Sequence, residues 1–104
     1  NIDGGPNKSG VAPGQALALA REVAQLPGLT LRGLMTIPEP APDFATALAV
    51  HRQARALFDD LCDAGLALDT LSMGMTADLE AAIHAGSTMV RVGTAIFGGR
   101  AYLA

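Results

Sequence analysis

Apolar residues recur at two alternating spacings along the chain, one typical of helices and one typical of strands. The helical spacing first appears between residues 13 and 26, and Pro13 suits the first position of a helix. The dipeptide Pro27-Gly28 ends this predicted helix. Its apolar stripe is Ala16, Leu19, Ala20, Val23 and Leu26.

A second, longer helix is predicted after the proline-rich segment 38–42. Asp43 suits its N-cap, because a carboxylate can accept a hydrogen bond from the first turn. The helix extends to about Ala64, and Gly65 suits the position that follows a helix. The apolar side of this helix is formed by Phe44, Leu48, Ala54, Phe58 and Leu61.

Short apolar runs between the helices predict strands at residues 29–37, 68–73 and 89–92. Residues 1–2 resemble the end of a further strand, and a glycine-rich loop follows them. The run in 29–37 is nearly continuous, which is typical of a strand that is covered on both faces.

Two short helices complete the pattern. Thr76 is a predicted N-cap of the first, and Asp78 lies in its first turn, where the helix dipole favours a negative charge. Gly86 ends this helix, and residues 93–98 predict a turn into the second.

Strands that alternate with helices indicate an α/β protein with a parallel sheet. An open doubly wound sheet and part of a (β/α)8 TIM barrel both fit this order. A complete barrel needs about 250 residues, so four strand–helix units in 104 residues make half of one. The chain begins at Asn1 rather than Met, and we expect an upstream portion to be missing. Residues 1–104 are then the C-terminal portion of a single barrel domain.

Composition narrows the possible partners. The net charge is −3, and the seven basic residues are scattered, which argues against binding to nucleic acid. No stretch approaches the roughly 18 apolar residues of a membrane span, and no signal peptide is visible. The one cysteine, Cys62, cannot form an internal disulfide. We expect it to be a small buried hydrophobe in a helix of a cytoplasmic protein.

Arg91 lies inside the last apolar strand. Side chains alternate along a strand, so Val90 and Val92 face the helices while Arg91 points to the opposite side. A charge in that place needs a partner. The sequence leaves two possibilities open, a structural ion pair with an upstream carboxylate or contact with a ligand.

Two neighbouring strand-to-helix junctions could bind a phosphate group. Gly93 and Thr94 follow the last strand, where free backbone N–H groups and a hydroxyl suit an anion. Barrels often bind phosphate in the loops after their last two strands. Ser72 lies at the end of the preceding strand, and Thr76 follows it. Each junction alone could be an ordinary helix cap, but two adjacent junctions favour a ligand site.

Other residues give weaker indications of a functional site. Lys8 is the only lysine, and its polar glycine-rich loop offers little burial for a reactive amine, so we expect a solvated residue there. His51 and His84 have no Cys, Asp or His at a ligand spacing, so we expect no metal site. Met35, near the end of its strand, lies either beside the ligand or in the core.

Four motifs, taken in order, resemble the PLP homeostasis protein family, also called the YggS or proline synthase co-transcribed family. They are KSG at 8–10, LRGLMTIP at 31–38, LSMGMTADLEAAI at 71–83 and GSTMVRVGTAIFG at 86–98. Together they span nearly the whole chain. Members of this family are stand-alone barrels of the alanine-racemase type (fold type III), and the resemblance implies that this chain binds pyridoxal 5′-phosphate (PLP).

The resemblance also implies roles for single residues. Arg91 would face the pyridine nitrogen and keep it unprotonated, because a guanidinium cannot accept a proton. Met35 would lie close to the ring. The residues implied to hold the cofactor phosphate are Ser72, Gly93, Thr94 and, less strongly, Thr76.

This sequence departs from the family pattern at the lysine that links the protein covalently to the cofactor. In the family the lysine that forms the Schiff base lies on an early barrel strand, upstream of these motifs. Lys8 does not match it. The chain would therefore supply the phosphate and ring-nitrogen contacts, while the lysine lies outside it.

We favour a PLP carrier without turnover of its own, and we assign no catalytic residue. The alternative is an amino-acid racemase on the same barrel. Such racemases resemble one another in carrying a second, β-rich domain, and their last strand tends to read Arg-Pro-Gly where this chain has Arg91-Val92-Gly93. The chain stops at Ala104, which we take as a further sign of the carrier.

Two other interpretations stay open. The barrel could bind a different phosphorylated ligand, which would give Arg91 no pyridine partner. A half-barrel with exposed sheet edges could also bind nothing alone, and it would tend to associate. For the full-length protein we expect a monomer or a weak homodimer.

Overall fold

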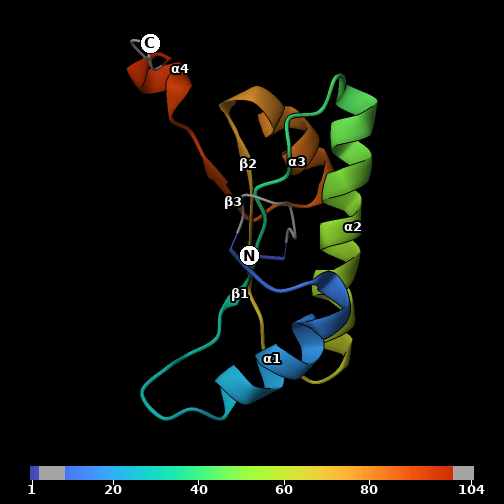
Figure 1. The fold of residues 1–104 in the computed structure, drawn as a ribbon, viewed down its shortest axis with the longest axis vertical. Helices are drawn as coiled ribbons and strands as arrows, with labels where there is room; N and C mark the ends of the chain where they lie inside the picture. Colours follow the sequence, from blue (N-terminus) through green and yellow to red (C-terminus); the bar gives the residue numbers. More distant parts are fainter. Residues whose placement is uncertain (3–8, 100–104) are drawn as a thin grey trace.

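The structure is a computed structural model that describes residues 1–2 and 9–99. Within these residues three parallel strands form one sheet in the order β1-β2-β3 (Figure 1). The strands are β1 (Gly33–Met35), β2 (Thr70–Met75) and β3 (Met89–Arg91). Neighbours in the chain are therefore neighbours in the sheet, as in the wall of a barrel.

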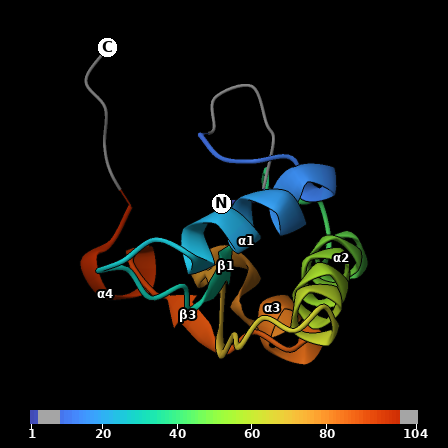
Figure 2. The ribbon, with the colours of Figure 1, turned by 90° about the horizontal axis from the view of Figure 1, so that it is seen from below.

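The helical elements, in chain order, are η1 (Pro13–Gln15), α1 (Ala16–Ala24), α2 (Phe44–Asp63), η2 (Thr76–Asp78), α3 (Leu79–Ala85) and α4 (Thr94–Phe97). In the chain, α2 lies between β1 and β2, and α3 lies between β2 and β3. Figures 1 and 2 both show α2 running beside α3, and the two helices are in contact. The short α4 lies apart from them, on the far side of β3.

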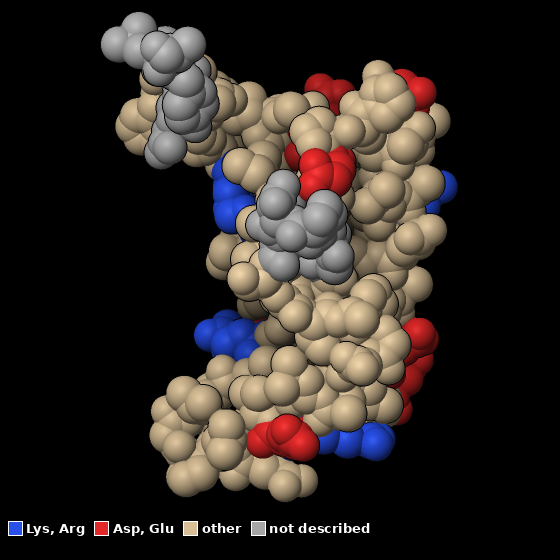
Figure 3. Space-filling model, in the orientation of Figure 1, with Lys and Arg blue, Asp and Glu red and all other residues tan. Residues whose placement is uncertain are grey.

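Two surface properties of the described residues concern possible partners, namely the length of the apolar helices and the distribution of charge. None of the described helices is long and apolar enough to cross a membrane. On the face shown in Figure 3, basic and acidic side chains are interspersed with uncharged surface.

The alternating pattern of strands and helices is confirmed, and several boundaries are corrected. The predicted strand 29–37 is reduced to β1, because it pairs with β2 only from Gly33 to Met35. Leu29 is 59% exposed and lies before the paired part. Residues 1–2 are not a strand, although the Ile2 amide donates a hydrogen bond to the Met35 carbonyl at 2.9 Å.

The core lies between β2 and the helices. Leu71 and Met73 are fully buried there, against Phe58 of α2 and Ala82 of α3. The predicted stripes of the helices are only partly correct, because the small residues are buried and several large ones are exposed. The exposed members of the predicted stripes are Leu19, Leu26 and Phe44.

The predicted N-cap of α2 and the predicted C-terminal ends of α2 and α3 are confirmed. The Asp43 carboxylate accepts a hydrogen bond from the Thr46 amide at 2.8 Å, and this bond lowers the pKa of that carboxyl. Gly65 follows α2 with a φ of +100°, and Gly86 ends α3 with a φ of +105°.

Gly74 lies at an irregularity near the end of β2. The pairing of β2 with β3 shifts register between Ser72 and Met75, so the strand holds an irregularity there. Gly74 has a φ of +103°, and a Cβ atom on it would lie 2.5 Å from the Ala82 Cβ. A residue with a side chain would therefore be strained in its backbone and would collide with α3.

One polar pair is built into this core. His51, in the middle of α2, is fully buried, and its Nε2 lies 2.7 Å from Oδ2 of Asp78. Oδ1 of Asp78 accepts a hydrogen bond from the Met75 amide at 2.7 Å. Partial burial by itself would raise the pKa of the Asp78 carboxyl, but the bonds from Met75 and His51 outweigh it, and the pKa is lowered.

We expect Gly74→Ala to destabilise the protein by about 2 kcal/mol, because it combines an unfavourable φ with a steric collision. Urea unfolding measures the effect. The control is Gly14→Ala, since nothing lies within 4 Å of a Cβ at that position. Equal unfolding free energies for the two variants would contradict this account of β2.

The lowered pKa of Asp78 predicts a dependence of stability on acid. The ionised carboxylate stabilises the folded state above its usual pKa near 3.8, and this stability is lost as the pH falls through the lower folded value. The difference in unfolding free energy between the wild type and Asp78→Asn should therefore be constant near neutral pH and shrink in acid. A difference that does not change with pH would show that the carboxylate charge contributes nothing.

Candidate functional site

The face of the sheet opposite the helices carries the candidate site. Paired residues in a parallel sheet point to the same side. Met35 pairs with Ser72, and Met75 pairs with Arg91. Because Leu71 is buried under the helices, Ser72 points away from them. The predicted orientation of Arg91 away from the helix layer is thus confirmed.

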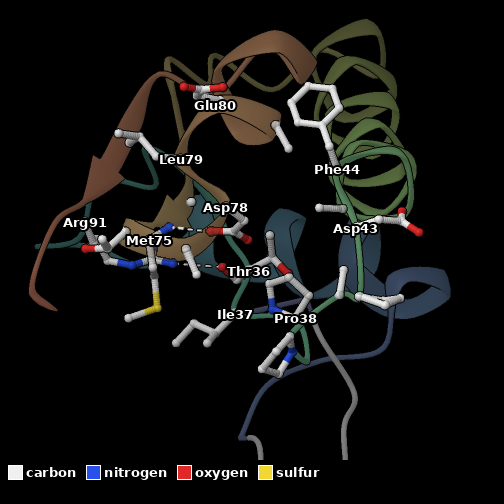
Figure 4. A pocket seen from close by; sticks show the side chains of 18 residues that line it. Thr36, Ile37, Pro38, Asp43, Phe44, Met75, Asp78, Leu79, Glu80 and Arg91 are labelled. Atoms are coloured by element: carbon white, nitrogen blue, oxygen red, sulfur yellow. Dashed lines mark hydrogen bonds between the residues drawn. The ribbon is translucent and has the colours of Figure 1, made fainter. Parts of the chain in front are cut away.

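The Arg91 guanidinium is held by uncharged oxygens. Its Nη1 donates to Oγ of Ser72 at 2.6 Å and to the Ser72 carbonyl at 3.2 Å. Its Nη2 donates to the carbonyl of Thr36, a buried residue, at 2.9 Å (Figure 4). Among the described residues it forms no ion pair. The structural ion pair that the sequence left open is therefore not formed within the described part of the chain.

Thr76 has a different role from the predicted one. The N-cap of η2 is Met75 and that of α3 is Asp78, so the prediction that Thr76 caps this helix is wrong. Its Oγ1 instead accepts hydrogen bonds from the backbone amides of Gly93 at 3.3 Å and Ala95 at 3.2 Å. The hydroxyl fits there because α4 begins with unsatisfied backbone donors. Thr76 therefore ties the end of β2 to the start of α4.

The predicted site residues thus form two neighbouring groups. One contains Ser72 and Arg91, with Met35 beside Ser72 in the sheet register. The other contains Thr76 and Gly93, and the exposed Thr94 is the first residue of α4. No hydrogen bond between described residues joins the two groups. They follow one another along β2 and β3, at the carboxyl ends of the strands.

A cavity of about 520 Å³ opens near the two groups, and each group contributes one of its predicted residues to the lining, Arg91 from the first and Thr76 from the second. Arg91, Thr36 and Met75 line one side of it, while Phe44 and Asp43 of the α2 start lie across from them (Figure 4). Barrel proteins place their ligands at the carboxyl ends of the strands, where this cavity lies.

The chemistry of these groups suits an anion rather than a metal ion. A guanidinium, hydroxyl groups and backbone amides donate hydrogen bonds to phosphate oxygens. Among the described residues, no three His, Cys, Asp or Glu side chains gather closely enough to hold a metal.

The sequence also led to predictions for three residues outside the proposed ligand site, Cys62, His84 and Lys8. Cys62 is only half-buried, so the prediction of a buried thiol is corrected; its Sγ lies 3.9 Å from the Leu68 carbonyl. The His84 ring packs edge-on against Phe44, with centroids 5.8 Å apart. Lys8 lies outside the described residues.

Sequence reasoning missed the His51–Asp78 pair and the part played by the Thr36 carbonyl. A signal for the pair was present, since His51 falls on the buried stripe of α2 between Ala47 and Ala54. A polar residue at a core position needs a hydrogen-bond partner. The contact of Thr36 uses a main-chain oxygen and so leaves no mark in the sequence.

Comparison with known proteins shows the family of this chain. The family model described as the alanine racemase N-terminal domain matches residues 1–101. A pyridoxal phosphate homeostasis protein of Vibrio cholerae is 52% identical over 102 residues, which is 98% of this chain and 43% of that protein. The protein of the same name from Pseudomonas aeruginosa is 55% identical over 102 residues, again 98% of this chain and 43% of the relative.

Solved structures show the same fold. PipY of Synechococcus elongatus, solved with PLP bound, superposes with a TM-score of 0.81 and 34% identity, covering 93% of this chain and 46% of PipY. A protein of unknown function from Bifidobacterium adolescentis superposes with a TM-score of 0.82 and 40% identity, covering 93% of this chain and 40% of that one.

These comparisons confirm the resemblance that the four sequence motifs indicated. The chain spans less than half the length of these curated relatives and solved structures. The match of the family model covers nearly all of the chain, and the parallel sheet agrees with it. The chain belongs to the family of proteins that contain the alanine racemase N-terminal domain.

Proposed function

We propose that the protein containing this chain binds PLP and acts in PLP homeostasis as a carrier of the cofactor without turnover. The observation that carries the proposal is the Arg91 guanidinium, which lies on the inner face of the sheet and is held there by uncharged oxygens. Residues 1–104 would form the C-terminal portion of a single barrel domain that binds the cofactor.

The phosphate of PLP would be held by Ser72, Thr76, Gly93 and Thr94. Their hydroxyl groups and backbone amides are donors of the kind that phosphate oxygens require. Two of the amides at the start of α4 already bind the Thr76 hydroxyl. The exposed Thr94 hydroxyl and the remaining donors would therefore make the direct contacts, while Thr76 keeps this turn in place.

Arg91 would hold the pyridine nitrogen of the cofactor. A guanidinium has five N–H donors, and the contacts with Ser72 and Thr36 use only Nη1 and Nη2. Donors thus remain for a ring nitrogen. Since Arg91 cannot accept a proton, it keeps this nitrogen unprotonated. Met35, beside Ser72 in the sheet, would contact the ring.

Bound PLP supplies an aldehyde that reacts with amines and a ring that withdraws electrons from them. An Arg at the ring nitrogen weakens that withdrawal compared with a carboxylate, which favours storage over turnover. The relatives named pyridoxal phosphate homeostasis proteins and the PLP-bound PipY structure support PLP binding and a role in PLP homeostasis. The lysine that bonds to the aldehyde would come from another part of the protein, which we place in the cytoplasm as a monomer or weak homodimer.

PLP binding by the full-length protein tests the proposal. We expect purified protein to take up PLP with a change in its visible absorbance, and Ser72→Ala and Thr94→Val each to weaken binding by about tenfold, the cost of one hydrogen bond to a charged group. Thr30→Val is the control, because Thr30 is exposed and lies outside the helices and strands. Failure of the wild type to take up PLP would refute the carrier proposal. Unchanged binding in both variants would remove these residues from the site.

The family model leaves one second candidate, an amino-acid racemase. Racemisation of alanine and other amino acids by the PLP-loaded protein separates the two functions. As a carrier, the protein should racemise no faster than the same concentration of free PLP. Turnover that exceeds this background, and that falls with the Ser72→Ala variant, would instead establish the racemase.

A further inference from the structure

His51 occupies a position that an apolar side chain would normally fill. It lies on the buried stripe of α2, and its side chain is fully enclosed. Its Nδ1 atom is buried without a hydrogen-bond partner among the described residues. A buried polar atom without a partner costs stability. Stability alone therefore does not explain why this position holds a histidine.

The other ring nitrogen makes a directed contact. Nε2 of His51 lies 2.7 Å from Oδ2 of Asp78, and the pKa of this carboxyl is lowered, so the group is an ionised acceptor at neutral pH. A carboxylate can only accept, which means that Nε2 carries the proton and donates it. The second oxygen of Asp78 binds the Met75 amide at 2.7 Å. Asp78 thus links the middle of α2 to the end of β2.

Thr76 connects the end of β2, which Asp78 binds, to the candidate phosphate site. Thr76 follows Met75 directly, and its hydroxyl binds the amides of Gly93 and Ala95. Hydrogen bonds therefore link His51 to Met75 through Asp78, the backbone continues from Met75 to Thr76, and further hydrogen bonds link Thr76 to the start of α4. Asp78 is a quarter exposed and also lines the cavity beside Arg91 (Figure 4).

We propose that His51 is a positioning residue for the cofactor phosphate. Acting through Asp78, it fixes the turn after β2 and so places the Thr76 hydroxyl and the first turn of α4. This role rests on the proposed function, since it concerns the same phosphate site. His51 itself does not line the cavity, and its hydrogen bond is to Asp78 rather than to a predicted phosphate-binding residue.

Two substitutions of His51 separate positioning from packing. His51→Phe keeps a ring of similar size but removes the donor, whereas His51→Gln keeps an N–H donor at the place of Nε2. For His51→Phe we expect about tenfold weaker PLP binding, the cost of one hydrogen bond to a charged group. We also expect faster hydrogen exchange at the Gly93 and Ala95 amides, measured under conditions in which the variants are fully folded. His51→Gln should bind PLP within about twofold of the wild type.

Several outcomes would overturn this role. Unchanged PLP affinity and amide exchange in His51→Phe would show that the ring only fills the core, and equal loss in both variants would show that the donor does not matter. If His51→Phe does not fold, Asp78→Asn replaces it. An Asn side chain has a single oxygen acceptor, so it cannot replace both carboxylate oxygens, one at His51 Nε2–H and one at the Met75 amide. The same loss of affinity is therefore expected, and its absence would refute the proposal.

The amide exchange measurement keeps the two proposals distinguishable. If the wild type takes up no PLP, the proposed function fails, and the role of His51 toward the cofactor phosphate fails with it. If the wild type binds PLP while His51→Phe matches it in affinity and exchange, the positioning role alone fails.

Discussion

The candidate site depends on a guanidinium placed on the inner face of a parallel sheet without a carboxylate among the described residues. Burying a charge is costly unless hydrogen bonds compensate for it. Here Ser72 of β2, the strand next to β3, and the carbonyl of Thr36, which directly follows β1, supply them. Because Arg91 is satisfied by uncharged oxygens, its positive charge stays available to a ligand at the carboxyl ends of the strands.

Three consecutive parallel strands bring these groups together. The register aligns Met35 with Ser72, and the irregularity at Gly74 turns Met75 to the side of Arg91. The left-handed φ of Gly74 lets β2 approach α3 closely. Beyond β3, the exposed side chains of Ile96 and Phe97 show that α4 has little cover from the described chain, with 68% and 83% of them accessible.

Periodicity and caps predicted much of this fold. The alternation of elements, the Asp43 cap, the glycine after α2 and the direction of Arg91 all follow from local rules that act within a few residues. The predicted stripes failed where tertiary packing decides which members of a stripe are covered, since in α1 Ala16 is buried while Leu19 is exposed.

Contacts between distant segments could not be predicted in this way. Thr76 looked like a cap for the helix that follows it, but its hydroxyl binds the start of α4, which only the tertiary structure brings near. The bond between His51 and Asp78 likewise spans two helical segments. These contacts surround the site, and they hold the turns that local rules place only approximately.

A crystal structure of the full-length protein with PLP is the most direct test of the central claim. The account predicts that Arg91 keeps its bonds to Ser72 and Thr36 and faces the pyridine nitrogen, with the phosphate next to the start of α4. A structure in which a carboxylate from another part of the protein pairs with Arg91, or in which PLP binds away from this face of the sheet, would contradict it.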